Sequence, residues 1–306
     1  MQKRSTSRQG DALLACAVRA AMAAAVLAAT AACTDTAPSR VLQPAAAPLA
    51  DRAGNRTDRD ETREIHGKRE KLGDGSARTY VILGGERKQV PIEIGVVLDK
   101  RALEGLPTSA PGGPEPHYEH LLELPKHHGT QFQFVELDWN QAGHEPPGVY
   151  TVPHFDFHFY TISLAERNSI DPSDPQFAAK ANNVPTGPYV PPFYIVPGPP
   201  AAVAVPHMGV HWLDVRSPEL QGLLGNPSAY RPFTKTFIYG SWNGRLTFFE
   251  PMITLEYLRS RPNVVTPIPQ PARYPQPGYY PTGYRVTYDA HAREHRIGLV
   301  GLTWRD

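Results

Sequence analysis

The stretch VPHFDFHFYTIS, residues 152–163, alternates polar side chains that could do chemistry with phenylalanines. Alternate side chains of an extended strand share a face, so His154, Asp156 and His158 should point one way and the phenylalanines the other. Neutral imidazole and carboxylate groups are ligands of Zn²⁺ and similar ions. The pattern therefore indicates a candidate metal site, and its alternative is an ordinary strand whose polar face meets water.

The geometry of a strand limits how these polar residues could share one ion. At roughly 3.3 Å per residue, the Cα atoms of His154 and His158 should lie about 13 Å apart, so both reach one ion only at full stretch. We expect Asp156 to bind with one flanking histidine, or to orient a ligating histidine through a hydrogen bond. The other ligands must then come from other strands.

Two further segments could supply those ligands. In VPHMGVHWLD, residues 205–214, two histidines stand four apart, and the glycine between them could bend the strand. A glutamate in FFEPMIT lies among apolar residues, where a carboxylate is costly to bury without a partner. This glutamate is a candidate oxygen ligand or general base. The predicted site comprises His154, Asp156, His158, His207, His211 and Glu250, with Zn²⁺ or alternatively Mn, Fe or Cu as the divalent ion.

Histidine is concentrated in one third of the chain, with most of its 12 copies between residues 117 and 211. The loop histidines rank below those on strands: His117, His120, His127, His128 and His144. The sequence contains no G-x-S-x-G elbow, Walker loop or H-E-x-x-H helix. Glu119 and Glu123, or Glu136 and Asp138, could pair as glycosidase acids, but nothing in their spacing selects them. Whether the protein is an enzyme therefore stays open.

The elements that must position these residues are mainly strands. The 33 prolines disfavour a helical bundle and favour strands joined by stiff loops. We expect a mainly β fold, an antiparallel barrel or sandwich with a few short helices. Two proline-rich stretches, 185–206 and 262–281, read as extended connections.

The clearest hairpin is TKTFIYGSWNGRLTFFEP, in which Asn243-Gly244 is the preferred pair for a two-residue type I′ turn. A regular ladder from that turn would place Phe237 opposite Glu250. This register predicts that Glu250 shares its face with Phe237 and Tyr239.

The N-terminus is typical of an exported protein. Residues 1–32 combine basic residues, a short apolar run and closing small residues, as in a signal peptide. Cys33 follows Thr30-Ala31-Ala32, which resembles a bacterial lipobox and predicts lipidation and a membrane anchor. Residues 33–70 read as a flexible tether, and residues 71–306 as a single β-rich domain. The location would be the periplasm or a membrane-anchored lipoprotein.

The charge of the chain argues against one class of partner. Lys and Arg number 31 and Asp and Glu 30, for a net charge of +1. We see no basic stripe and no nucleic-acid-binding motif, so no nucleic-acid partner is expected.

Several motifs together resemble an uncharacterised family of exported bacterial proteins, the TTHB-type family. They are HFDFHFY, GHEPPGVY, PHMGVHW and TFIYGSWNGRLTFFEPMIT, and with SARTYV and LEGLP the resemblance covers roughly residues 75–260. It implies a β-rich domain and possible homo-oligomer formation, and no established activity. The HFDFHF and GVHW stretches also resemble the zinc-binding strands of α-type carbonic anhydrases. Asp156 stands where that family has a histidine, which argues against its activity.

Two functions of different class remain. The first is an exported envelope protein of unknown activity with a divalent-metal site built from His, Asp and Glu on strands. The alternative is a non-catalytic structural or assembly lipoprotein whose histidine-rich face is a subunit interface.

Overall fold

The computed structural model describes residues 62–109 and 117–306. The expected signal peptide, Cys33 and most of the expected tether lie outside these residues. The tether was expected to extend to residue 70, but Arg63–His66 forms strand β1 and pairs with a neighbouring strand, so that boundary is wrong. Two ion-pair contacts between Glu64 and Arg296 attach this edge strand, at 2.8 and 3.1 Å. Polar composition alone did not reveal this pairing.

Seven strands form the first sheet, in the order β1-β3-β4-β15-β14-β12 with β2 added at β3. Their bounds are Arg63–His66 for β1, Glu70–Leu72 for β2, Gly75–Gly84 for β3, Val90–Leu98 for β4, Asn263–Pro267 for β12, Gly283–Asp289 for β14 and Glu294–Val300 for β15. The strands pair antiparallel throughout. The first part of the proline-rich stretch 262–281 therefore forms β12, which lies at the edge of the sheet, where proline is tolerated.

Another seven strands form the second sheet, in the order β5-β6-β7-β11-β10-β9-β8. Their bounds are Tyr118–Glu123 for β5, Phe134–Asn140 for β6, His154–Tyr160 for β7, Tyr194–Ile195 for β8, Val210–Asp214 for β9, Lys235–Trp242 for β10 and Arg245–Thr254 for β11. A separate pair joins β13, Gly278–Tyr280, to β16, Thr303–Arg305. β7 lies near the middle of the sheet, between β6 and β11.

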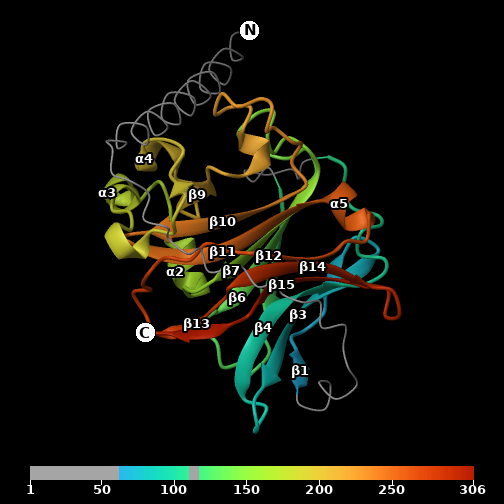
Figure 1. Ribbon diagram of the computed structural model, residues 1–306. Coiled ribbons are helices and arrows are strands. Elements are labelled where there is room, and N and C mark those ends of the chain that lie inside the picture. The colour runs from blue at the N-terminus through green and yellow to red at the C-terminus, as the bar shows by residue number, and fades with distance from the viewer. Residues whose placement is uncertain (1–61, 110–116) are drawn as a thin grey trace, which may run out of the picture.

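The two sheets share one hydrophobic core and pack as a sandwich (Figure 1). Val81, Ile94 and Leu299 of the first sheet belong to the same buried cluster as Phe157 and Phe249 of the second. Neither sheet closes on itself within the described residues, so the barrel alternative is wrong and the mainly β, antiparallel expectation is confirmed.

Short helices connect the strands. They are α2 at Leu164–Asn168, α3 at Phe177–Asn182, α4 at Pro200–Val203 and α5 at Leu255–Arg259, with 3-10 turns η2 at Gly187–Tyr189 and η3 at Pro218–Leu220. In Figure 1, α3 and α4 lie beside β9 and β10. The stretch 185–206 thus contains a short strand and helix as well as connections. Among the helices of residues 62–109 and 117–306, none is both long and apolar enough to cross a membrane.

A β-bulge corrects the expected register of the β10–β11 hairpin. The turn is as expected, with φ of 47° at Asn243 and 85° at Gly244. The register then shifts between Gly240 and Ser241, so Glu250 pairs with Ile238 instead of Phe237. One residue of slip exchanges the two faces of a strand. Glu250 consequently points away from the sandwich core, toward the outer face of the second sheet.

Candidate metal centre

β7 divides its side chains between two buried faces. Its phenylalanines, at positions 155, 157 and 159, are each 0% exposed and belong to the sandwich core. On the opposite face, His154 is 0%, Asp156 4% and His158 1% exposed. The interpretation of this polar face as a solvated surface is therefore wrong. Polar groups buried this deeply must find partners or remain costly.

The neighbouring strands add polar groups to the same face, and we call the whole set the polar layer. It comprises Glu136, Asp138 and Asn140 of β6, His154, Asp156 and His158 of β7, His211 of β9 and Glu250 of β11. In β6, the residues between these polar positions enter the sandwich core, because the strand alternates as β7 does.

Two apolar clusters cover the outer face on either side of the polar layer. One includes Tyr160, Trp242 and Phe248, packed against residues of α3 and α4. The other includes Tyr150 and Phe233, contributed by loops. Because chain segments lie over the sheet here, the polar layer is enclosed within a single chain instead of lying on its surface.

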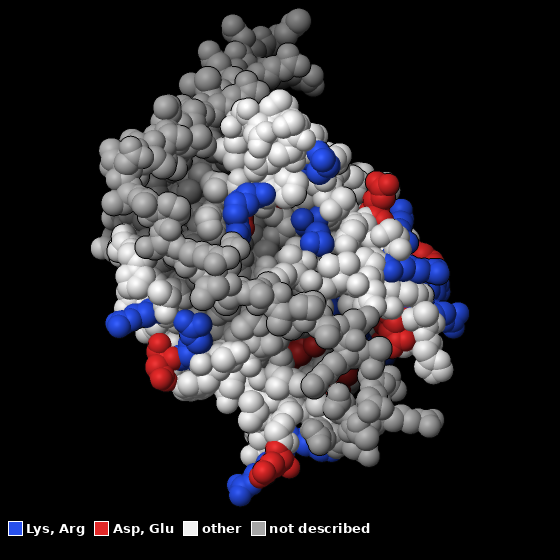
Figure 2. Space-filling view, in the orientation of Figure 1, with Lys and Arg blue, Asp and Glu red and all other residues white. Residues whose placement is uncertain are grey.

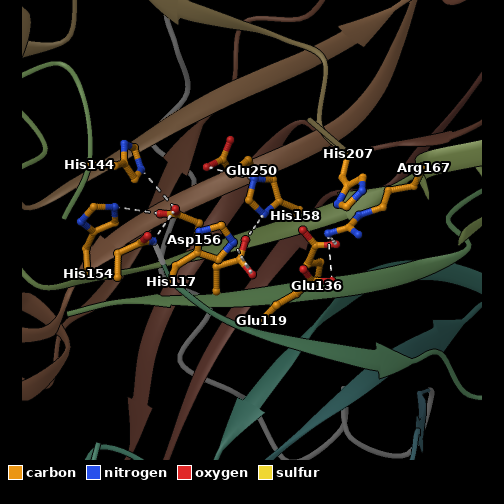
Figure 3. A network of polar contacts seen from close by, with 12 residues as sticks. His117, Glu119, Glu136, His144, His154, Asp156, His158, Arg167, His207 and Glu250 are labelled. Carbon is orange, nitrogen blue, oxygen red and sulfur yellow. Dashed lines mark hydrogen bonds and ion pairs between the residues drawn. The ribbon is translucent and has the colours of Figure 1, made fainter. Parts of the chain in front are cut away.

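His144, His154 and Asp156 form one group of convergent donors. Nε2 of His144 lies 3.3 Å from Oδ2 of Asp156, and Nε2 of His154 lies 3.1 Å from Oδ1 of the same carboxylate. Asn140 donates a hydrogen bond of 2.7 Å to Oδ2. Figure 3 shows both imidazoles directed at Asp156 from the same end of the layer. One potential ligand atom from each residue lies within 4.8 Å of the others.

His158, His211 and Glu250 form a second group, whose ligand atoms likewise lie within 4.8 Å of one another. Nε2 of His158 lies 3.4 Å from Glu250, and Nε2 of His211 lies 3.9 Å from the other oxygen of that carboxylate. Nδ1 of His158 lies 3.3 Å from Asp138. Glu136, Asp138 and His158 also satisfy the same distance criterion.

The predicted single site is thus divided between two groups. His154 with Asp156, and His158 with His211, sit in different clusters, in agreement with the distance limit on a strand. His207 joins neither cluster. It occupies a left-handed turn, φ 65°, before β9, where its backbone N–H donates to Ile170. In Figure 3 it lies on the Arg167 side of His158.

Four residues of this network were ranked low or not identified from the sequence. His144 ranked low because it lies in a loop, yet the chain folds it back over β7. Glu136 and Asp138 carried a usable signal, since they alternate along β6 as the histidines do along β7. Arg167 carried none, because a helical arginine of five-residue α2 resembles an ordinary surface cation.

Arg167 supplies a permanent positive charge at one end of the layer. It is 4% exposed, and its Nη2 lies 2.6 Å from Glu136 and 2.9 Å from Glu119. Among the described residues, the ion-pair partners of Asp138, Asp156 and Glu250 are all histidines. The layer therefore holds carboxylates whose compensation depends on protons or on another cation.

Burial dominates the protonation of the layer. It raises the pKa of Glu136 and of Asp138 to about 8, and it raises that of Glu250 well above its ordinary value, with neighbouring carboxylates adding to the effect. Burial also lowers the pKa of His211 to about 3, so that imidazole is neutral near pH 7. Asp156 differs. Although burial acts to raise it, the adjacent imidazoles hold the pKa of Asp156 well below its usual range.

Residues 87–139 match a family model named TTHB210-like and described as Hypothetical protein TTHB210. The resemblance to an uncharacterised TTHB-type family is confirmed over this segment, which includes β4, β5 and most of β6. The motifs on β7, β9 and β11 lie outside the match. No curated protein and no solved structure matches the chain. The comparison names no activity, so chemistry must be argued from the side chains.

Proposed function

We propose that the protein binds a divalent transition-metal ion through His144, His154 and Asp156. The observation that carries this proposal is how the two imidazoles are held. Nδ1 of His144 lies 2.7 Å from the carbonyl oxygen of Glu145, and Nδ1 of His154 lies 2.7 Å from that of Val152. A carbonyl oxygen only accepts, so each Nδ1 must carry the donated proton.

This tautomer has a direct chemical consequence. In the neutral ring the other nitrogen, Nε2, carries a lone pair, and both of these lone pairs face the carboxylate of Asp156. Two lone pairs opposite carboxylate oxygens repel, so either a proton on Nε2 or a metal ion must lie between them. A ligating histidine that donates its second ring N–H to a backbone carbonyl is the usual arrangement around protein-bound metals.

The spacing of the donors fits a metal. Two ligand atoms bound tetrahedrally at about 2.0–2.1 Å lie about 3.3–3.4 Å apart. The observed separations from Asp156 are 3.3 Å for His144 and 3.1 Å for His154. Two imidazoles and one carboxylate suit Zn²⁺, with Mn, Fe or Cu as alternatives. The side chain of His144 is 32% exposed, so a fourth position could take water, which a bound metal would activate.

Metal titration of the chelator-stripped full chain tests this proposal. Zn²⁺ should bind the wild type, and both His144→Ala and Asp156→Asn should weaken this ion's binding by about 100-fold or more, because each removes a ligand. Bound metal should also raise the melting temperature, since a ligand at 100 times its Kd stabilises the folded state by about 2.7 kcal/mol.

His291→Ala is the matched control, because that histidine is exposed in the turn between β14 and β15 and should leave Zn²⁺ binding unchanged. Wild-type protein that takes up no Zn²⁺, Mn²⁺, Fe²⁺ or Cu²⁺, with an unchanged melting temperature, would refute metal binding. The triad would then be a protonated histidine–aspartate network. The non-catalytic assembly protein would become the better proposal, with half-buried His144 and His211 as its candidates for a homo-oligomer interface.

Export of this metal-binding domain, and its anchoring to a membrane through Cys33, are part of the same proposal. Their support is the basic, apolar and small-residue order of residues 1–33.

A further inference from the structure

The second group of donors, in the middle of the polar layer, lies outside the proposed metal site. His158 is 1% and Glu250 1% exposed, so both are enclosed by protein. The side chain of His211 is 20% exposed and closes the group from β9. Three strands, β7, β9 and β11, each contribute one donor, and the sheet fixes their spacing. Figure 3 shows His158 between Glu250 and Glu136 of β6.

The surroundings of these donors make an uncompensated arrangement costly. The ring of Phe248 contacts both imidazoles, with centroids 4.9 Å from His158 and 5.2 Å from His211. An apolar ring at this position solvates no charge. Within the described part of the chain, both ring nitrogens of His158 and Oε2 of Glu250 lack a hydrogen bond of regular geometry. A native core seldom leaves such groups without partners.

Asp138 supplies the feature that separates a ligand from a structural histidine. Its Oδ2 lies 3.3 Å from Nδ1 of His158, while Nε2 of the same ring faces Glu250. A carboxylate on one ring nitrogen fixes the tautomer and leaves the opposite nitrogen free to bind a metal. Arg167 forms its ion pairs with Glu136 and Glu119, so among the described residues it is not an ion-pair partner of Asp138 or Glu250.

We propose that the protein holds a second divalent transition-metal ion, coordinated by His158, His211 and Glu250, with Asp138 orienting His158. This inference stands on different residues from the first site and does not require it. Two imidazoles and one carboxylate again favour Zn²⁺ or a neighbouring ion. The chain would then bind two ions per molecule, one at each end of the run His154–His158.

The stoichiometry of Zn²⁺ in the stripped full chain tests the inference. Wild type should bind two equivalents, and Glu250→Gln and His211→Ala should each bind one. His144→Ala should also bind one, and the combination of His144→Ala with Glu250→Gln should bind none. Glu250→Gln preserves the side chain's size while removing its charge. If Glu250→Gln fails to fold, His211→Ala, at the more open end of the site, provides the same test. The exposed His291→Ala should retain both ions.

The outcomes separate the two sites. One equivalent that disappears in His144→Ala but persists in Glu250→Gln and His211→Ala would overturn the second site and leave the first intact. One equivalent with the opposite dependence would overturn the first site and support the second. Two equivalents unaffected by both Glu250→Gln and His211→Ala would show that the second ion binds elsewhere, which also overturns the inference.

A readout independent of stoichiometry comes from Co²⁺ in place of Zn²⁺. Co²⁺ bound by imidazole and carboxylate gives visible absorption that reports its coordination. Asp138→Asn should still bind two ions, but the affinity for the ion at the second site should fall by about 10- to 100-fold, because only the orienting partner of His158 is changed. The absorption bands of that ion should shift, whereas those of the His144 site should not. Unchanged affinity and spectrum in Asp138→Asn would contradict the orienting role.

Discussion

At the scale of single residues, the tautomers of His144 and His154 determine what the polar layer can bind. Each ring has its Nδ1 occupied by a backbone carbonyl, so Nε2 is the one position at which a proton and a metal compete. The same carboxylate, Asp156, attracts either cation. Acidity is therefore the natural variable with which to separate the two states.

Zn²⁺ binding at the His144 site should weaken as the pH falls. Although burial acts to lower it, the hydrogen bond and charge of Asp156 raise the pKa of His144 above 6.5. Below that pKa the proton occupies Nε2, so affinity should fall by about tenfold per pH unit for each histidine that must lose a proton. Calorimetric titration of Glu250→Gln with Zn²⁺ between pH 8 and 5 isolates this site. A Zn²⁺ affinity that does not change over that pH range would count against histidine ligation.

The sequence was informative about some residues and silent about others for a physical reason. Alternation along a strand is local, so the opposite directions of Phe157 and His158 could be read directly from residues 152–163. Contacts made by loops are not local. His144 reaches Asp156 only because residues 141–150 fold back over β7, and no periodicity in a loop encodes that return.

At the scale of elements, the bulge in β11, where Thr247 is the extra residue between Leu246 and Phe248, determines which face receives Glu250. A regular ladder from the Asn243-Gly244 turn would place this carboxylate on the face of Phe237 and Tyr239, as expected from the sequence, and in the structure that face belongs to the sandwich core. The shift between Gly240 and Ser241 reverses that direction. Bulges re-aim side chains in this way, and they depend on local packing that a hydrophobic pattern does not reveal. The fold class was therefore predictable, while the position of the key carboxylate was not.

Gly240, on β10 beside the bulge, offers a test of how tightly the β10–β11 hairpin is packed. A Cβ added at this position would collide with the ring of Phe248, which in turn contacts His158 and His211. Gly240→Ala should therefore lower the free energy of unfolding by about 1–3 kcal/mol. It should also lower the Zn²⁺ affinity of the second site more than that of the first. Urea denaturation of the metal-free protein and Zn²⁺ titration measure the two effects.

The control for that substitution is Gly222→Ala, where the nearest atom to an added Cβ is in Tyr230 at 3.4 Å, an ordinary contact. This variant should stay within about 0.5 kcal/mol of wild type. Equal stability of the two alanine variants would mean that Phe248 moves freely, and the proposed role of its ring in enclosing the second site would fail.

At the scale of the whole molecule, both faces of the second sheet are buried at its central strands β6, β7 and β11, one by the first sheet and the other by helices and loops. A strand pattern of alternating phenylalanine and polar residues normally means one wet face, so the cover had to be seen in the structure. On the view in Figure 2, basic and acidic side chains of the described residues are interspersed. On this face, the described residues therefore form no large patch of a single sign.

The address of the molecule is a separate prediction, and Cys33 is the residue on which it depends. The chain contains 2 cysteines, Cys16 and Cys33, so a thioether-linked lipid has two candidate sulfurs. Cys33 follows the apolar run and three small residues, whereas little apolar sequence precedes Cys16. Expressed in a bacterium, the chain should mature to begin at a lipidated Cys33. A lipid with more than one acyl chain would make the protein fractionate with membranes, since a single acyl chain gives only marginal binding. Cys33→Ser should abolish the lipid mass and the membrane association, and Cys16→Ser should change neither. Intact mass spectrometry of a wild-type mature protein that starts elsewhere, or carries no lipid, would replace the anchored form with a freely released one.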